Sequence, residues 1–331
     1  MPRKELQRYL TILGADSREE LEGRIVSRVM EALRNSGLSK PPIRLSPIAE
    51  MFQIRPRPSP NPDTRRGSLA YDSGAGTFLI SLNSNQGAAE PDTPFADTLT
   101  RVQRFAYAHE FVHRFLFISQ ADHWSRALTV VVEESPSEDR LGTTRFLSHL
   151  EEKICDVSAG RILVPEDALE ACVADKAASW PSGDLLWTLI GDVARTFQVS
   201  WACAFRRLSK TKPHAVMASL GDSFCFLLVG SSRATGRGSG QPRIRLIDYW
   251  WPTTVGDTLV KDVYPGLPLR HLGEDLEEIV GGILARESPE AGDMRCVVLV
   301  KSKKNEDDKL IPGEFEGRWK RWGRASNAMV A

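Results

Sequence analysis

The sequence predicts an α+β protein with two domains, and three observations lead to this prediction. Apolar residues recur at helical spacing through much of the chain before Pro213. Between Gly67 and Leu82, two apolar runs flank a glycine-containing turn, which is typical of a β-hairpin. After Pro213 the sequence changes to strand-like apolar runs. With 331 residues, the chain is also too long for one ordinary core.

The first residues predict a helical segment over residues 1–40. Apolar positions from Glu5 to Leu33 have helical spacing, interrupted at Asp16-Ser17, where a second helix can be capped. Gly37 is expected to end that helix, because glycine readily adopts the left-handed conformation of a C-terminal cap. A short helix is expected to begin near Ser46 and to end at Met51.

The next segment alternates between turn signals and regular patterns. Proline occupies alternate positions between Arg55 and Pro62, so we expect an exposed connector there without regular structure. The hairpin strands are expected at Ser68–Tyr71 and Thr77–Leu82. Helical spacing then returns from Ala96 to about Ile118.

Four further helical patterns complete the first domain, which we place at residues 41–212. The acidic run from Glu133 to Asp139 is expected to be a solvated loop. A helix from about Arg145 to Leu163 should end before Pro165, because proline cannot continue it. Shorter helices are expected at Glu166–Ala174, Gly183–Phe197 and Ser200–Leu208.

The second domain is placed at residues 216–331, after a boundary near residues 211–216. Its sequence predicts mixed α+β structure, with some exposed order near Trp319–Trp322. Strands are expected at Ala215–Val229, Ile244–Trp251 and Met294–Ser302, a helix at Glu274–Ala285, and a flexible loop at Ser231–Gly240.

Composition restricts the classes of function. Hydrophobic residues make up 41% and charged residues 26%, close to the globular average. Lys+Arg and Asp+Glu both number 43, so the zero formal charge excludes a protein that binds polyanions over its whole surface. The longest apolar runs are far below the roughly 20 residues that span a bilayer, so we expect no membrane contact.

The N-terminal residues and the cysteines predict a cytoplasmic location. The sequence Met1-Pro2-Arg3-Lys4-Glu5 leads into a charged amphipathic stretch without the apolar core of a secretory signal. The cysteines are dispersed, without a CxxC pair, which favours reduced thiols. They are Cys155, Cys172, Cys203, Cys225 and Cys296.

One motif carries chemistry. His109-Glu110-Phe111-Val112-His113 is an HExxH sequence within a predicted helix, and its histidines lie one turn apart on the same face. Both imidazoles can therefore reach one zinc ion, and Glu110 can activate a water bound to that ion. The chain holds only 6 histidines, so a chance occurrence of this motif is rare.

A catalytic zinc needs a third protein ligand, because such sites use three protein ligands and a water. The residues after the motif, Arg114–Ser119, exclude the longer HExxHxxGxxH pattern. Glu152 on the later helix is the preferred third ligand, since Asp156 one turn beyond it could hold a ligating imidazole by a hydrogen bond.

Three alternatives to Glu152 remain open at this point. His149 is three residues earlier and could reach the same side of the helix. Glu151 is rotated by about 100° and so does not share that face. The acidic run between Glu133 and Asp139 supplies further carboxylates.

In these motifs and their order, the chain resembles the ImmA/IrrE-type metallopeptidases. The hairpin that ends in Ile80–Asn85 precedes a segment similar to the family's RFTLAHELGH-like helix. A segment resembling ExxAN-x-FAAxLLMP and two helices resembling the family's closing pair follow. The segments that carry the resemblance are Gly67–Asn83, Arg104–His113, Glu152–Pro165, Val193–Ser200 and Arg206–Leu208.

The resemblance implies a zincin-like helical core of gluzincin type with a small hairpin or sheet. It implies that His109, His113 and Glu152 bind Zn²⁺, that Glu110 is the general base, and that Asp156 supports a ligating histidine. It also implies a regulatory endopeptidase that cleaves a helix-turn-helix repressor or an antitoxin, in transcription regulation or a stress response. A C-terminal sensor domain, in some members GAF-like, is expected with it.

The sequence departs from the family pattern in places that leave the ligands intact. Phe111-Val112 replaces Leu-Gly, Cys155-Asp156 replaces Ala-Asn, and Ser158-Ala159-Gly160 replaces Phe-Ala-Ala. The interval between His113 and Glu152 is long and includes the acidic run. These differences bear on the choice of substrate.

Hydrolysis also needs a donor for the carbonyl oxygen, and the spacing does not choose among Arg104, Tyr107 and Arg114. Tyr107 is about 200° around the helix from His109, which favours packing over catalysis. The strand at Thr77–Leu82, taken as the edge of the hairpin, could align an extended substrate by strand addition.

Two other classes of function compete with the peptidase. The pair of helices in Leu185–Leu208, with basic residues near its end, suits a helix-turn-helix that binds DNA. A helical support for the metal site is favoured instead, because Trp201 and Phe205 need burial. The third hypothesis is a non-catalytic zinc protein that acts by protein–protein binding, against which the intact Glu110 argues.

Overall fold

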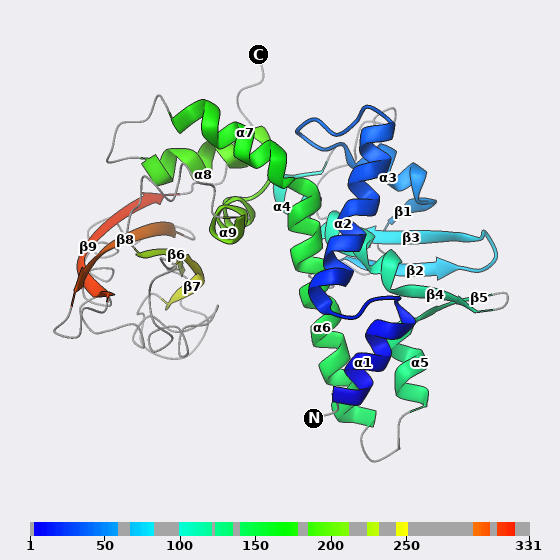
Figure 1. Ribbon diagram of the computed structural model, residues 1–331. Coiled ribbons are helices and arrows are strands. Elements are labelled where there is room, and N and C mark those ends of the chain that lie inside the picture. The colour runs from blue at the N-terminus through cyan, green and yellow to red at the C-terminus, as the bar shows by residue number, and fades with distance from the viewer. Residues whose placement is uncertain are drawn as a thin grey trace. The chain divides into compact units, whose positions relative to one another are not determined.

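The protein is a helix-rich mixed α+β molecule with small sheets (Figure 1). The computed structural model describes residues 3–58, 67–82, 99–120, 123–134, 140–177, 185–211, 224–231, 243–250, 294–304 and 310–321. The chain divides into two compact units, of which the first comprises Met1–Cys172 and Gly191–Arg207, and the second Val173–Ile190 and Leu208–Ala331.

The N-terminal helices form as the sequence predicts and belong to the first unit. Helix α1 covers Arg3–Ile12 and α2 covers Arg18–Asn35. The break between them is capped by Ser17, whose side chain accepts a hydrogen bond of 3.1 Å from the Glu20 amide. Gly37 follows α2 with φ +68°, the left-handed conformation expected at this end.

The prediction of an irregular connector at Arg55–Pro62 is wrong for its first residues. After α3 (Leu45–Met51), the segment Ile54–Pro58 forms strand β1, which pairs in parallel with β3. Because β1 is an edge strand, the alternate positions occupied by proline can face away from the sheet without losing a ladder hydrogen bond. Residues 59–62 lie outside the described part of the chain.

The predicted hairpin is confirmed, but its expected edge is not. Strands β2 (Ser68–Asp72) and β3 (Thr77–Leu82) pair antiparallel, and Asp72 Oδ1 accepts hydrogen bonds from two amides of the turn. The strand order is β1-β3-β2, so the largely buried β3 is the central strand. The prediction that Thr77–Leu82 is a free edge is therefore wrong; among the described strands, β2 has its second side unpaired.

The helix that carries HExxH is shorter than the predicted Ala96–Ile118. Helix α4 covers Arg101–His113 and begins at a capping box formed by Thr100 and Gln103. A 3-10 turn, Arg114–Leu116, follows it and leads into β4 (Phe117–Gln120). Strand β4 pairs antiparallel with β5 (His123–Arg126), an unpredicted hairpin whose Phe117 ring packs against Phe78, 5.2 Å between ring centroids.

Helix α6 is the longest helix that the structure describes, and several others pack against it (Figure 1). It covers Arg140–Leu163, which begins five residues before the predicted start and ends before Pro165 as predicted. Helices α2, α4 and α5 (Ala127–Glu133) contact it. Glu133 ends α5, and residues 135–139 of the predicted acidic loop lie outside the described residues.

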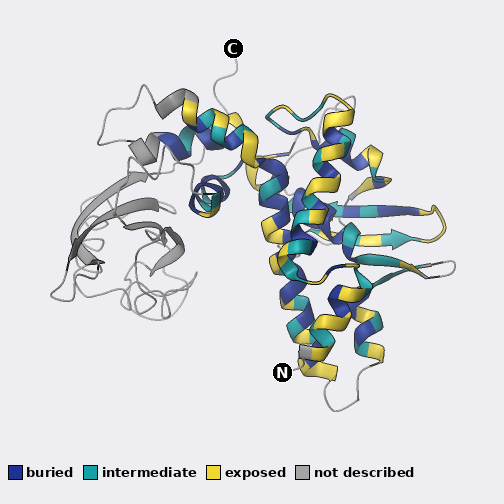
Figure 2. Ribbon diagram, viewed as in Figure 1, coloured by how far each residue is buried: buried dark blue, intermediate teal, exposed yellow. Residues whose placement is uncertain are grey.

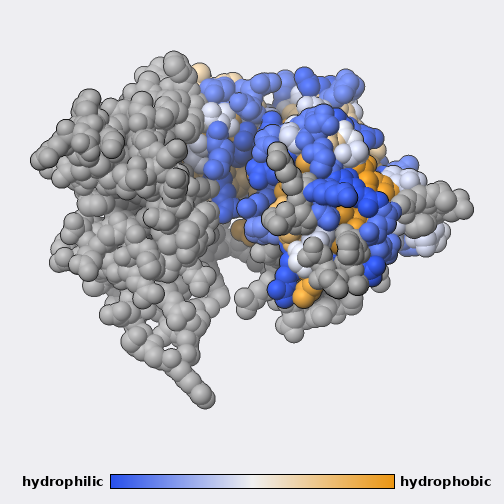
Figure 3. Space-filling view, turned by 60° about the horizontal axis from the view of Figure 1, so that its bottom comes forward, coloured by the Kyte–Doolittle hydropathy of each residue, from blue (hydrophilic) through white to orange (hydrophobic). Residues whose placement is uncertain are grey.

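The core of the first unit lies between these helices and the three-stranded sheet (Figure 2). Its fully buried side chains include Val29, Ile80 and Leu147. Hydrophilic residues cover most of the described surface on the face shown in Figure 3. No helix among the described residues has the length and apolar character that a membrane crossing requires.

The helices that follow α6 confirm the predicted elements. They are α7 (Glu166–Ala177), α8 (Leu185–Thr196) and α9 (Trp201–Thr211), and the two compact units divide within them. Ser200 caps α9 by accepting a hydrogen bond of 3.2 Å from the Cys203 amide. Trp201 and Phe205 are buried, as a supporting role for α9 requires.

After Thr211, the described part of the second unit is an antiparallel sheet with the strand order β7-β6-β8-β9. Its strands are β6 (Phe224–Ser231), β7 (Arg243–Trp250), β8 (Met294–Lys304) and β9 (Leu310–Arg321). Strand β9 begins nine residues before the order expected near Trp319–Trp322, and the alternation of charged and apolar residues from Glu314 to Lys320 was the available signal. The predicted helix at 274–285 and most of the loop at 231–240 lie outside the described residues.

Arg104 links helix α4, which carries the HExxH motif, to two distant segments of the first unit. Its Nε donates to the carbonyl oxygen of Gln198 (3.1 Å) and its Nη2 to that of Ile43 (2.7 Å). Because the Arg104 side chain is buried, its removal would leave both carbonyl groups without a hydrogen-bond donor and without access to water.

We expect Arg104→Met to lower the free energy of unfolding by about 2–4 kcal/mol, because two buried carbonyl groups lose a charged donor. Urea unfolding followed by far-UV circular dichroism measures this loss. Arg101→Met, at an exposed position of the same helix, is the control and should change stability little. Equal effects of the two substitutions would contradict the role of Arg104.

Candidate metal centre

Helix α4 presents its HExxH residues to helix α6. His109, Glu110 and His113 are all buried, and the two imidazole ring centroids are 5.1 Å apart. Because the two histidines are one turn apart, both project from the same side of α4. Helices α4 and α6 pack against each other, so the motif meets side chains of α6.

Glu152 of α6 lies between the two imidazoles. Its Oε2 is 3.4 Å from His109 Nε2, and its Oε1 is 3.5 Å from His113 Nε2. Both distances exceed an ordinary hydrogen bond. Two ligand atoms on one tetrahedral zinc, each about 2.1 Å from it, are about 3.4 Å apart. The three predicted ligands are therefore brought together at a spacing that suits a shared divalent ion.

Asp156 lies one turn after Glu152 and engages the other nitrogen of His109. The distance from His109 Nδ1 to Asp156 Oδ1 is 2.9 Å, so Nδ1–H donates to the carboxylate and Nε2 is left for a metal. Burial lowers the pKa of His109, but the hydrogen bond to Asp156 and the nearby carboxylates outweigh it, and the pKa is raised overall. These surroundings favour a bound cation.

Cys155 is a possible ligand that the sequence analysis missed. Ligand atoms of His109, His113 and Cys155 all lie within 4.8 Å of one another, so these residues form a triad that could hold a metal ion. Burial raises the pKa of the Cys155 thiol, and neighbouring carboxylates raise it further. The position three residues after Glu152, where the resembled family has alanine, was the available signal.

The structure offers two third ligands, and we favour Glu152 over Cys155. Each carboxylate oxygen of Glu152 approaches a different imidazole nitrogen at a spacing that fits a metal, whereas the thiol is held neutral by its burial. Glu152 is also partly exposed, which places it at the open side of the centre.

The other predicted alternatives are separated from this group. His149 is exposed on α6 and does not line the cavity beside the centre. Glu151 is fully buried and accepts hydrogen bonds from Tyr9 Oη (3.0 Å) and from Arg126 Nη2. Its carboxylate is thus committed to other partners than the imidazoles.

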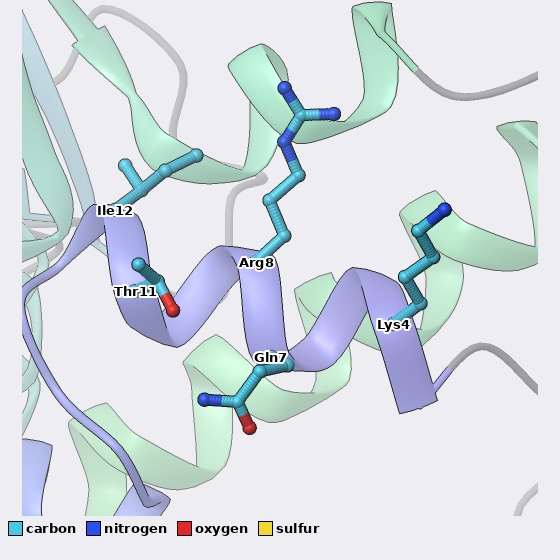
Figure 4. A pocket seen from close by; sticks show the side chains of 5 residues that line it. All are labelled: Lys4, Gln7, Arg8, Thr11 and Ile12. Atoms are coloured by element: carbon cyan, nitrogen blue, oxygen red, sulfur yellow. The ribbon is translucent and has the colours of Figure 1, made fainter.

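A cavity of about 230 Å³ opens beside the centre. Glu110, His113 and Glu152 line it, together with Gly67–Leu69 at the start of β2, Phe117 and Arg126. A larger hollow of about 560 Å³ lies on α1, but residues of that helix alone line it (Figure 4). The smaller cavity is the one that combines space with metal-ligating and acid–base groups.

Glu110 projects into this cavity from a buried position. Burial raises the pKa of its carboxyl group, and the charges of His113 and His109 oppose this effect only partly. A carboxylate with a raised pKa is a stronger proton acceptor, which suits a general base. The hairpin fixes its place closely: a Cβ added to Gly67 would lie 2.6 Å from Glu110 Cγ.

None of the three residues considered as donors for a carbonyl oxygen lines the cavity. Tyr107 is buried, which raises its pKa to about 12, and Arg104 binds backbone carbonyl groups. The Arg114 guanidinium stacks on the rings of Phe78 and Trp124, at 4.1 and 4.0 Å from their centroids.

We expect wild-type protein to retain a divalent metal and Glu152→Ala to lose it, because two imidazoles alone make a weak site. Metal analysis after exposure to a competing chelator measures this difference. His149→Ala and Cys155→Ala are the matched controls and should keep the metal. Loss of the metal in Cys155→Ala, with retention in Glu152→Ala, would instead make the thiol the third ligand.

Asp156→Ala should weaken metal binding by about 10–100-fold while the ligands stay in place, since the imidazole loses the partner that orients it. Titration against a chromophoric chelator gives the affinity. Lys153→Ala, at an exposed position of the same helix, should leave the affinity unchanged. An unchanged affinity in Asp156→Ala would show that the hydrogen bond does not support the metal.

Comparison with known proteins does not assign the chain to a family. No family model matches the sequence, and no curated protein is significantly similar to it. The resemblance to the ImmA/IrrE-type metallopeptidases therefore rests on the motifs and their order. The geometry stands independently of it: the Glu152 carboxylate lies within 3.5 Å of both imidazoles beside a cavity, and the Cys155 thiol forms a second possible triad with the same imidazoles.

Proposed function

We propose that the protein is a zinc-dependent endopeptidase with Glu110 as its general base. The observation that carries the proposal is the convergence of His109, His113 and Glu152, with Glu110 in the adjoining cavity. Two imidazoles and one carboxylate are the ligands of a well-known class of catalytic zinc site. A zinc ion held there would lower the pKa of a coordinated water and polarise a peptide carbonyl.

The residues of the chain account for the proton transfers. Glu110 takes a proton from the attacking water, and its raised pKa favours that transfer. It then delivers the proton to the amine that leaves. Asp156 keeps the Nδ1 proton on His109, so that Nε2 stays directed at Glu152.

The edge of β2 supports binding of an extended peptide. Gly67–Leu69 line the cavity, and among the described strands only β3 pairs with β2. A substrate in extended conformation could therefore add to the outer side of β2 and pass the centre. The same role, expected for Thr77–Leu82 from the sequence, falls to β2 because β3 is central.

The finer parts of the proposal follow from the resemblance. They are a zincin-like core, a helix-turn-helix repressor or antitoxin as substrate, a regulatory role in transcription or stress, and a sensory C-terminal unit. A cytoplasmic location is also part of the proposal, and it rests on the dispersed cysteines of the sequence, which include no CxxC pair.

The competing functions gain no specific support. Arg207, one of the basic residues of the suggested helix-turn-helix, is buried and donates from Nε to the Val164 carbonyl oxygen (3.0 Å). A side chain committed in this way does not face a phosphate backbone. A protein that acts only by binding would not need the buried Glu110 carboxylate in a cavity beside the centre.

Glu110→Gln should lower peptide cleavage by at least about 100-fold and retain the metal, because only proton transfer is removed. Mass spectrometry of a proteome-derived peptide library detects cleavage, and metal analysis of the same samples tests the centre. His149→Ala is the control and should cleave like the wild type. Undiminished cleavage by metal-loaded Glu110→Gln would exclude its role as base, and a wild type without metal would exclude the whole proposal.

A further inference from the structure

Arg126 is the one cationic side chain of arginine or lysine type that lines the described cavity beside the centre. It ends strand β5, opposite Phe117 of β4, so the β4–β5 hairpin brings both residues to the cavity wall. Glu110 and Glu152 line the same cavity.

A buried network holds the Arg126 side chain. Its Nη2 donates to Glu151 Oε2, and Tyr9 Oη donates to Glu151 Oε1 at 3.0 Å. Glu151 is fully buried, whereas the Arg126 side chain is 38% exposed. A guanidinium carries five N–H donors, so the bond to Glu151 orients the group and leaves donors for a ligand in the cavity.

Peptide hydrolysis creates a negative charge at a defined atom. As water adds to the carbonyl carbon, a C–O bond forms, the π electron pair moves to the carbonyl oxygen, and the water proton passes to Glu110. The C=O bond then re-forms as the C–N bond breaks, and the amine takes the proton from Glu110. A fixed hydrogen-bond donor near the oxygen stabilises it while it is negative.

We propose that Arg126 binds this oxygen, and that Glu151 and Tyr9 are positioning residues for its guanidinium. The inference rests on the proposed endopeptidase function and names the anion-binding residue of the same site. It assigns the role that the sequence left open among Arg104, Tyr107 and Arg114, none of which lines the cavity. The C-terminal carboxylate of a substrate is also an anion that this guanidinium could bind, and cleavage kinetics distinguish the two anions.

Ligand binding to cobalt(II)-loaded protein, followed by visible absorption, tests the anion site without a known substrate. Inorganic phosphate is the anionic probe and imidazole the neutral one. Arg126→Gln should weaken the binding of phosphate by at least about tenfold and that of imidazole by less than about twofold, since only the anion loses a charged partner. A structural defect of the centre would weaken both probes alike.

Matched variants separate this effect from loss of folding. Arg126→Gln leaves the buried Glu151 carboxylate without its cationic partner, so the double variant Arg126→Gln with Glu151→Gln restores neutrality and should show the same selective loss. Glu151→Gln alone should weaken the binding of phosphate to a smaller extent. Arg145→Gln makes the same charge change at an exposed position of α6 and should behave like the wild type.

Cleavage kinetics distinguish the two sources of the anion. With Arg126 on the carbonyl oxygen, Arg126→Gln should lower kcat by about 100-fold on peptides with free and with amidated C-termini. A rise in KM limited to free C-termini would assign Arg126 to a terminal carboxylate and overturn the proposal.

The outcomes keep this inference apart from the proposed function. A wild type that takes up no cobalt or zinc overturns both. A metal-loaded wild type, with phosphate bound equally well by Arg126→Gln, overturns the role of Arg126 and leaves the endopeptidase proposal standing.

Discussion

The gathering of negative charge around two buried imidazoles is the constraint on which the rest of this structure depends. Glu110, Glu152 and Asp156 all act on the pKa of His109, and burial alone would lower that pKa. Such a cluster is costly without positive charge at its centre. A divalent ion between the imidazoles and Glu152, as proposed, would supply that charge, and the spacing of these three side chains suits such an ion.

The cluster needs rigid supports, and each comes from a different part of the first unit. One turn of α4 and one turn of α6 carry the proposed ligands, while residues of the β2–β3 hairpin and the β4–β5 hairpin line the cavity. The N-terminal helix takes part through Tyr9, which bonds Glu151 of α6. Helix α1 is thus coupled to the cavity through Glu151 and Arg126, although residues 1–40 were expected to form a separate segment.

The sequence predicted what local periodicity and spacing determine. The HExxH turn, the pair Glu152 and Asp156, and the hairpin strands follow from repeats of a few residues. What it could not predict depends on pairing between distant segments. Strand β1 forms despite its prolines because it pairs with β3 at the edge of the sheet. The same pairing makes β3 the central strand. Arg126 reaches the cavity through the pairing of β5 with β4, so no local pattern indicated it.

Gly67 shows how little freedom this arrangement leaves. A methyl group added there would lie 2.6 Å from Glu110 Cγ and 2.7 Å from Leu82 Cδ2, so the backbone at Gly67 packs directly against the Glu110 side chain. At Gly67 the cavity lining beside Glu110 has no side chain, so it consists of main-chain atoms there, which offer the same groups to any peptide sequence. For the proposed peptidase, discrimination among peptides would then depend on the side chains that line the rest of the cavity, which differ in charge and shape.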